Sequence, residues 1–332
     1  MNKIKFGAAS LAVLGLFVFT SCSGKKGKNI EIKLAHNLNE KHSVHIALTD
    51  FANRVSAKSD GEITIQIYPN GQLGGEAEEL EQLKVGALGM TKVSAAALTT
   101  YSEGYNAFTL PYVFANEAHY YKCMESDAVK RLYTSTDGIG FRGLTFYDSG
   151  ARNFYTKNRP ILKPSDLNGL KIRVMGYQSQ TDMVRAMGGT PISMSFGEVY
   201  TALQSGVIDG TENNETALTV GGRHGEVCKH YSFDEHTRIP DILVVSTKVW
   251  NSLTPQQQNI IQEAALESTE YHKGLWRASV EEAKKEAAEK MNVQFYEVDK
   301  APFRAAVAPV VQGYTSSMAD VKSLVEAFAA LE

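Results

Sequence analysis

Alternating apolar and polar residues mark the first elements of the chain. Residues 30–34 (IEIKL) and 63–67 (ITIQI) alternate in this way, which predicts two β-strands. Between them, apolar residues recur at the spacing of one helical face, at Val44, Leu48, Phe51 and Val55. A strand, a helix and a second strand form a βαβ unit, which requires a parallel sheet covered by helices. The pattern therefore predicts the α/β fold class.

The same reasoning predicts the elements that follow. Further helices are expected at residues 76–85, 117–133, 180–187 and 196–204, and further strands at 90–93, 144–147, 153–155, 170–174, 207–210 and 243–246. The longest helix begins after Thr254, which suits an N-cap, with Pro255 in its first turn, and runs to about Lys290. At about 1.5 Å per residue it is on the order of 50 Å long, enough to brace two domains.

The first 29 residues have the layout of an export segment. Lys3 and Lys5 precede an uncharged apolar stretch, residues 6–20, which is too short for a membrane-spanning helix. Cys22 follows small residues, as in a bacterial lipobox, where the cysteine is acylated and becomes the mature N-terminus. The alternative is ordinary cleavage nearby, which discards Cys22. Residues 23–29 are polar and are expected to form a flexible spacer.

Composition limits the remaining classes of protein. The mature chain of about 310 residues exceeds the size at which a single core keeps growing, so two domains are predicted. A formal net charge of −3 gives no basic field for nucleic acid. Cys123 and Cys228, both in segments predicted to be helical, suit neither a metal cage nor a disulfide scaffold. We expect buried thiols, and the residues leave a single disulfide between them open.

Two arginines stand in apolar strand contexts. Arg173 projects from the face opposite the apolar residues of the strand at 170–174, and Arg152 precedes Phe154 and Tyr155. A buried guanidinium must find an anion, because leaving it alone costs free energy. It can hold a ligand carboxylate through two parallel hydrogen bonds. An internal salt bridge with Asp or Glu is the alternative, and the residues alone do not decide between them.

Three other patterns have chemical interest. Residues 209–215 (DGTENNE) follow a predicted strand, and their amides suit sugar-like hydroxyls, although a plain turn explains them equally well. Residues 138–143 (GIGFRG) match a dinucleotide fingerprint, but a helix precedes them and a strand follows, which is the wrong order. His36, His42 and His45 lie close in sequence without a carboxylate or cysteine at matching spacing. We therefore predict no cofactor and no metal site.

Six short motifs follow one another along almost the whole mature chain. They are LAHN at 34–37, LPYVF at 110–114, GAR at 150–152, GLKIRV at 169–174, FGEVYTALQ at 196–204 and VIDGTEN at 207–213. Together they resemble the extracytoplasmic solute receptors of TRAP (tripartite ATP-independent periplasmic) transporters. The resemblance implies a two-lobed fold like that of periplasmic binding proteins, with the long helix spanning both lobes. The first lobe is expected at residues 30–149 and about 240–279, and the second at about 150–239 and 280–332.

The resemblance also implies a ligand site. Arg173 matches the family's selectivity arginine, which holds the substrate carboxylate; Arg152 matches a second carboxylate-facing arginine, and Asn213 the asparagine that supports the carboxylate. Other candidate positions reach the ligand from the first lobe, line the pocket or stand near the hinge. These further candidate ligand-binding residues are Asn37, Glu76, Phe196, His236, Ser94, Glu212, Asn214 and His36.

The resemblance implies a receptor and not an enzyme. It would capture a small carboxylic acid by lobe closure and deliver it to the small and large membrane subunits of a transporter. Asn213-Asn214 and residues 234–238 (DEHTR) look like the branch that takes sugar acids such as glucuronate and galacturonate. Ser94 and Ala97 stand where the sialic-acid branch has an acidic residue and an arginine.

Other functions stay open at this point. A C4-dicarboxylate would need a second cation, which the sequence does not assign, and a keto acid is a further possible ligand. A sensory binding protein or an exported enzyme acting on sugar acids are alternatives of a different class. We expect a monomer without a nucleic-acid partner, and the lipid on Cys22 as its membrane contact.

Overall fold

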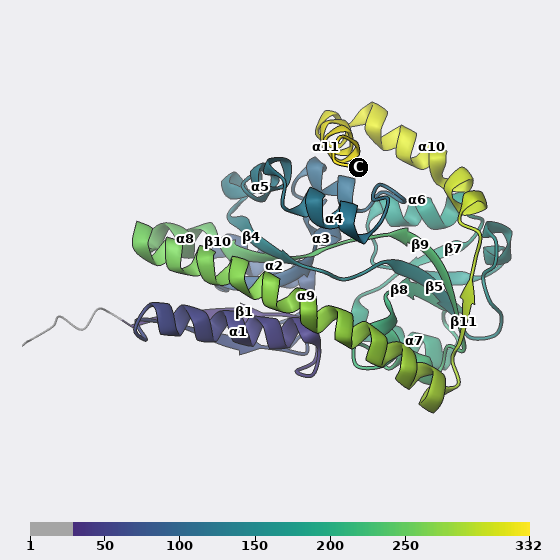
Figure 1. The fold of residues 1–332 in the computed structure, drawn as a ribbon, viewed down its shortest axis with the longest axis horizontal. Coiled ribbons are helices and arrows are strands. Elements are labelled where there is room, and N and C mark those ends of the chain that lie inside the picture. Colours follow the sequence, from purple (N-terminus) through teal and green to yellow (C-terminus); the bar gives the residue numbers. More distant parts are fainter. Residues whose placement is uncertain (1–28) are drawn as a thin grey trace, which may run out of the picture.

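Two mixed β-sheets with helices around them form the protein (Figure 1). The computed structural model describes residues 29–332; the predicted signal and Cys22 lie outside the described residues. The first sheet has the order β2 (Ile63–Tyr68), β1 (Ile30–Ala35), β3 (Met90–Ser94), β10 (Asp241–Ser246) and β4 (Phe141–Tyr147). β1 pairs in parallel with β2 and β3, and β10 runs antiparallel to β3 and β4.

The second sheet is built mainly from the middle of the chain. Its order is β11 (Gln294–Glu297), β9 (His230–Thr237), β5 (Arg152–Thr156), β8 (Gly210–Asn213), β6 (Lys171–Val174) and β7 (Thr190–Ser193). β6 is parallel to both β7 and β8, and β5 is antiparallel to β8 and β9. The chain enters this sheet between β4 and β5 and returns to the first sheet between β9 and β10.

The helices cover both sheets. They are α1 (Ser43–Lys58), α2 (Glu76–Val85), α3 (Ala95–Leu98), α4 (Glu117–Met124), α5 (Asp127–Tyr133), α6 (Gln178–Ala186), α7 (Val199–Ser205), α8 (Thr247–Ser252), α9 (Pro255–Met291), α10 (Ala301–Ser317) and α11 (Ala319–Ala329). The face of α1 predicted from its apolar spacing is fully buried. Among the described residues, no helix combines the length and apolar character that crossing a membrane requires.

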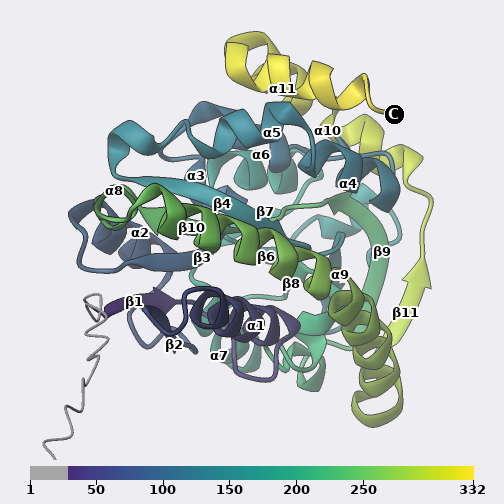
Figure 2. The same ribbon diagram turned by 60° about the vertical axis from the view of Figure 1, so that its left-hand side comes forward.

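The long helix α9 connects the two halves, as predicted. The Thr254 hydroxyl accepts from the backbone N–H of Gln257, and Gln257 Oε1 accepts from the backbone N–H of Thr254, which fixes the start. Its 37 residues correspond to about 55 Å. Ile261 packs in the core beside the first sheet, whereas Ala287 packs in the core of the second. Figure 2 shows α1 beside the first part of α9.

The two C-terminal helices divide between the sheets. Phe303 of α10 packs in a core cluster with residues of the second sheet and α6. Val321, Leu324 and Phe328 of α11 pack instead in the main core cluster of the first sheet. The expected boundaries gave residues 280–332 to the second lobe, but α11 returns to the first sheet. That return depends on packing between distant segments, which local periodicity does not encode.

Several local predictions were wrong. The helix expected at 117–133 is two helices, because Ser126 begins a new one by accepting from the backbone N–H of Val129. The strand expected at 207–210 begins only at Gly210, since Asp209 Oδ2 accepts from the backbone N–H of Lys171 at the strand end. Residues 210–213 are therefore strand and not loop. The elements that were not predicted are β7, β9, β11, α3, α8 and the two C-terminal helices.

Cys123 and Cys228 are buried and free, as expected for structural thiols. Cys123 lies in α4, but Cys228 lies in irregular structure before β9, so its predicted helix was wrong. The two residues belong to different core clusters, and they form no disulfide.

Replacing Phe328 tests the docking of α11. Phe328 is fully buried, and its ring lies 5.7 Å from Phe108 and 5.2 Å from Phe114, centroid to centroid. We expect Phe328→Ala to lower the free energy of unfolding by about 3–5 kcal/mol, measured by urea denaturation. Tyr271→Ala, at an exposed position of α9, should change it by less than about 0.5 kcal/mol. Equal effects of the two substitutions would contradict this packing.

Candidate functional site

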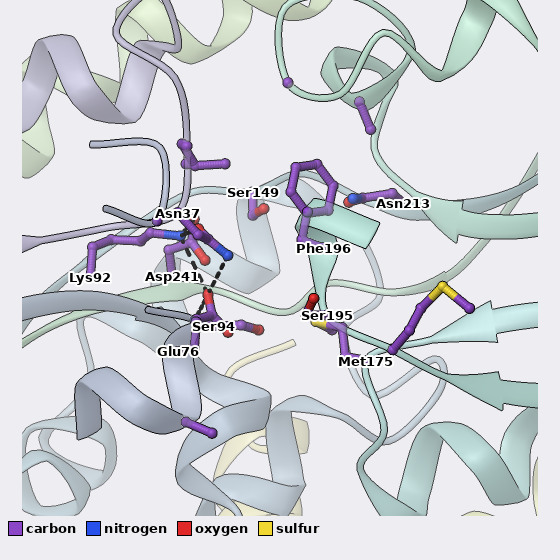
Figure 3. A pocket seen from close by; sticks show the side chains of 18 of the residues that line it. Asn37, Glu76, Lys92, Ser94, Ser149, Met175, Ser195, Phe196, Asn213 and Asp241 are labelled. Atoms are coloured by element: carbon purple, nitrogen blue, oxygen red, sulfur yellow. Dashed lines mark hydrogen bonds and ion pairs between the residues drawn. The ribbon is translucent and has the colours of Figure 1, made fainter. Parts of the chain in front are cut away.

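A cavity of about 620 Å³ lies between the two sheets. It is reached by the ends of β1 and β3 from the first sheet, by the ends of β6, β7 and β8 from the second, and by the start of α2. Ligands bind at this edge of α/β sheets, where the strands end and the helices begin. Figure 3 shows Asn37, Glu76, Lys92, Ser94 and Asp241 on one side of the cavity and Phe196, Asn213 and Met175 on the other.

Most of the predicted site residues line this cavity. They are Asn37, Glu76, Ser94, Arg152, Arg173, Phe196, Asn213 and Asn214. Glu212, His236 and His36 do not line it. The first two lie behind Arg152. His36 is fully buried and contacts His45 through its ring nitrogen at 2.9 Å. Among the described residues there is no group of three His, Cys, Asp or Glu side chains arranged to hold a metal ion.

Arg173 reaches the cavity from β6 without a carboxylate partner. It is only 2% exposed. Its Nε and Nη2 donate to the backbone oxygen of Met194, at 3.1 and 2.8 Å, and Nη1 donates to no residue of the described chain. Burial lowers the pKa of Arg173 to about 10, with the charge of Glu212 opposing this shift and that of Arg152 adding to it, so Arg173 stays charged at neutral pH. A buried cation without a counterion costs free energy, which an anion in the cavity would recover.

Arg152 is held very differently. Its Nε and Nη2 donate to the two carboxylate oxygens of Glu212, and Nη2 also donates to the Glu212 backbone oxygen. Its Nη1 donates to Asn213 Oδ1 at 3.0 Å. One N–H of Nη1 is left for the cavity, since a guanidinium has five. Glu212 is fully buried. Burial alone would raise the pKa of Glu212, but Arg152 and His236 outweigh it and lower that pKa to about 2.

A bulge in β9 supplies the next charges behind Arg152. β9 pairs Thr237 with Arg152 and Ser232 with Phe154, so residues 233–236 stand opposite Asn153 alone. The bulge turns Asp234 and His236 into the interior, where both are fully buried. His236 Nδ1 lies 2.7 Å from Asp234 Oδ2, and its Nε2 lies 3.3 Å from Glu212 Oε2. Burial alone would lower the pKa of His236, but the two carboxylates raise it to about 9.

The side chains of Asn213 and Asn214 make different contacts. Asn213 Oδ1 accepts from Arg152 and from the backbone N–H of Asn214. Because arginine only donates, the oxygen of Asn213 must face Arg152, which leaves its amide N–H₂ as the free end toward the cavity. The amide of Asn214 is used inside the protein: it donates to the backbone oxygen of Ser149 and accepts from Thr216. Asn214 therefore ties the end of β8 to the crossover between the sheets.

The opposite wall contains a cation that the sequence analysis missed. Lys92 is 2% exposed, and its Nζ lies 3.4 Å from Asp241 Oδ2, 3.5 Å from Glu76 Oε1 and 3.2 Å from Asn37 Oδ1. Burial alone would lower the pKa of Lys92, but Asp241 and Glu76 raise it. Burial raises the pKa of Glu76, whereas Lys92 opposes that rise. In the sequence, Lys92 was marked only by its place inside the short strand MTKVS. The structure shows that every residue of this strand is buried.

The cavity offers an aromatic ring and polar groups for binding. Phe196 is half-buried and presents a ring beside the polar groups, and its centroid lies 5.5 Å from that of His224. The buried carboxylate Glu212 is engaged by Arg152 and His236, so it is not available as a general base toward the cavity. Donors gather on the second-sheet wall and carboxylates on the first. This arrangement suits a polar ligand with an anionic end.

Comparison with known proteins assigns the fold and site to a family. Residues 34–317 match the bacterial extracellular solute-binding protein family 7. The chain belongs to this family. It is 44% identical to the uncharacterized protein YiiZ of Salmonella typhimurium over 306 residues, which is 92% of this chain and 91% of that protein. The family 7 assignment confirms the predicted class: an extracytoplasmic solute-binding receptor of TRAP transporters and not an enzyme.

Solved structures of TRAP periplasmic solute-binding proteins confirm the two-lobed α/β fold. A TRAP periplasmic solute-binding protein from Anaerococcus prevotii, with bound α/β-D-glucuronate, is 36% identical with a TM-score of 0.89, covering 91% of this chain and 98% of that one. One from a Sulfitobacter species, with bound β-D-galacturonate, is 32% identical with a TM-score of 0.86, covering 90% and 99%.

The buried charges behind Arg152 make a prediction about pH. A histidine whose pKa is raised from 6.5 to about 9 stabilises the fold fully below pH 6.5, and this contribution is lost as the pH rises through 9. Between those values, the free energy of unfolding of the wild type should fall relative to His236→Gln by up to about 1.4 kcal/mol per pH unit in urea denaturation. His230→Gln, outside this cluster, should keep the wild-type slope. Parallel curves for wild type and His236→Gln would contradict a protonated His236.

Proposed function

We propose that this family 7 receptor binds hexuronates such as glucuronate and galacturonate, and that Arg173 holds their carboxylate. The observation that carries the proposal is a guanidinium that is 2% exposed, lines the cavity and has no acidic partner within the described chain. Structures of TRAP periplasmic solute-binding proteins in which glucuronate or galacturonate is bound, at 36% and 32% identity, support the choice of ligand.

The carboxylate would meet donors from three side chains. The Nη1–Nη2 edge of Arg173 is suited to a bidentate contact, because Met194 occupies the Nε side. The amide N–H₂ of Asn213 and the last N–H of Arg152 stand in the same wall. Arg152 is thus mainly a structural cation that orients Asn213, and Arg173 supplies the charge that the ligand neutralises.

The hydroxyl groups would meet the opposite wall. Asn37, Glu76 and Ser94 line the cavity there and carry both donors and acceptors. Phe196 offers an apolar ring face for the C–H groups of a sugar. One carboxylate at one end and several hydroxyls at the other match the distribution of groups between the two walls.

Closure of two lobes around the ligand follows from the connections between the sheets. We infer lobes close to the predicted ranges, 30–149 with 240–279 and 150–239 with 280–318, with α11 added to the first. Phe196 from the second-sheet side packs against the core of the first sheet. Tyr177 and Met175, also after β6, pack against the main core cluster of the first sheet. These contacts across the cavity would break when the lobes open.

The loaded receptor would deliver its ligand, as a monomer, to the small and large membrane subunits of a TRAP transporter. A lipid on Cys22 would keep it at the membrane, with residues 23–29 as a spacer.

The different partners of the two arginines give a matched test. Arg173→Gln removes an unpaired charge, so the ligand-free protein should keep its free energy of unfolding within about 1 kcal/mol or gain stability. Its affinity for glucuronate should fall at least about 100-fold in calorimetric titration, since two hydrogen bonds to a charged group are lost. Arg152→Gln leaves Glu212 buried without its partner and should destabilise the ligand-free protein by about 3–5 kcal/mol.

Two outcomes would contradict the proposal. Unchanged glucuronate affinity in Arg173→Gln would show that another group holds the carboxylate. A large loss of stability in ligand-free Arg173→Gln would show that this residue is structural. Glucose, which lacks the carboxylate, should bind the wild type at least about 100-fold more weakly than glucuronate.

Replacing Cys22 tests the lipid anchor. In cells making Cys22→Ala, mature protein should move from the membrane fraction to the soluble extracytoplasmic fraction, because a polar spacer has no membrane affinity. Cys123→Ala, which changes a buried thiol, is the control and should stay with the membrane. Membrane association that survives in Cys22→Ala would refute acylation at this position.

A further inference from the structure

The first-sheet wall of the cavity carries more negative than positive charge. Lys92 is its one buried cation among the described lining residues, and it faces two carboxylates, Glu76 and Asp241. With Asn37 Oδ1 at 3.2 Å, its ammonium has three protein oxygens around it. The hydrogen bond to Asn37 and the two ion pairs turn the ammonium of Lys92 toward protein oxygens, and the two carboxylates balance its charge. Glu76 and Asp241 against one ammonium leave one net negative charge, and Glu78 of α2 adds a further carboxylate to the lining.

The outer oxygen of each carboxylate is available to a ligand. Glu76 Oε1 accepts from the backbone N–H of Ser94 at 3.0 Å and from Asn37 Nδ2 at 3.4 Å, and Asp241 Oδ2 faces Lys92. Glu76 Oε2 and Asp241 Oδ1 have no hydrogen-bond or ion-pair partner within residues 29–332. A ligand hydroxyl can donate to these oxygens, whereas a ligand carboxylate only accepts.

We propose that Glu76 and Asp241 determine specificity by rejecting a second carboxylate, so that the receptor takes polyhydroxy monocarboxylates and excludes dicarboxylates of the same carbon number. This inference rests on the proposed function, because it requires the first carboxylate to lie on Arg173. Lys92 alone would suggest a place for the second end of a dicarboxylate. Its pairing with two acids reverses that conclusion, since a like charge placed beside Glu76 and Asp241 costs affinity.

A hexuronate and a hexaldarate provide the direct comparison, because they differ by one carboxylate. In calorimetric titrations, wild-type protein should bind D-glucuronate at least about 100-fold more tightly than D-glucarate. Asp241→Asn keeps the size of the side chain and one acceptor oxygen but removes a negative charge. We expect it to reduce the glucuronate-to-glucarate ratio at least about tenfold, which corresponds to about 1.4 kcal/mol. The change in ratio between proteins cancels the difference in shape between ring and open chain.

Two further variants make the experiment decisive. Glu76→Gln should reduce the same ratio, and it replaces Asp241→Asn if that variant does not fold. Glu31→Gln changes the net charge equally, but at an exposed position of β1 outside the cavity, so its ratio should equal that of the wild type. An equal drop in Glu31→Gln would show that the effect is general electrostatics and would overturn the proposal.

The failures of the two proposals are distinguishable. If wild-type protein binds glucuronate and glucarate within about threefold of each other, selectivity by Glu76 and Asp241 is wrong and the hexuronate receptor stands. The same holds if the ratio is large but both charge-removing variants leave it unchanged. If the wild type binds neither glucuronate nor galacturonate, the proposed function itself fails, and this inference fails with it.

Discussion

A guanidinium buried without a counterion is the constraint on which the site depends. Behind the second-sheet wall, the charges of Arg152, Glu212, His236 and Asp234 neutralise one another. Within this group of charges, Arg152 also fixes the side chain of Asn213. Arg173 is then the only cation of the second-sheet wall without an acidic partner among the described residues. The fold thus bears the cost of desolvating Arg173 in advance, and a ligand carboxylate would recover it on binding.

The opposite wall gives the cavity its polarity. Lys92, Glu76 and Asp241 come from three different segments, β3, the start of α2 and the start of β10. β3 and β10 are neighbours in the first sheet, with Ser94 directly opposite Asp241, so the register of this pair brings the charges together. One wall attracts a carboxylate, and the other accepts hydrogen bonds. We therefore expect a ligand with a single anionic end to bind in one orientation.

The sequence predicted the features that depend on neighbouring residues. The capping pattern at Thr254 predicted the start of α9. The alternation of Ile172 and Val174 predicted that Arg173 lies on the opposite face of the strand from these apolar residues. Features that depend on distant partners were missed. The residues next to Lys92 in the sequence do not indicate that it is buried beside two acids. The bulge interrupts the alternation that would have predicted β9. Glu212 of β8 pairs with Arg152 of the neighbouring strand β5, which lies far from it in the sequence. The roles of the site residues in binding stay predictions.

The central claim is that the ligand lies with its carboxylate on Arg173 and its hydroxyls toward Glu76 and Asp241. A crystal structure of the protein with glucuronate tests this claim most directly. The account predicts the carboxylate within hydrogen-bond distance of Nη1 and Nη2 of Arg173 and of the Asn213 amide, with hydroxyls near Glu76 Oε2 and Asp241 Oδ1. A sugar bound in the opposite direction, with its carboxylate on Lys92, would contradict it.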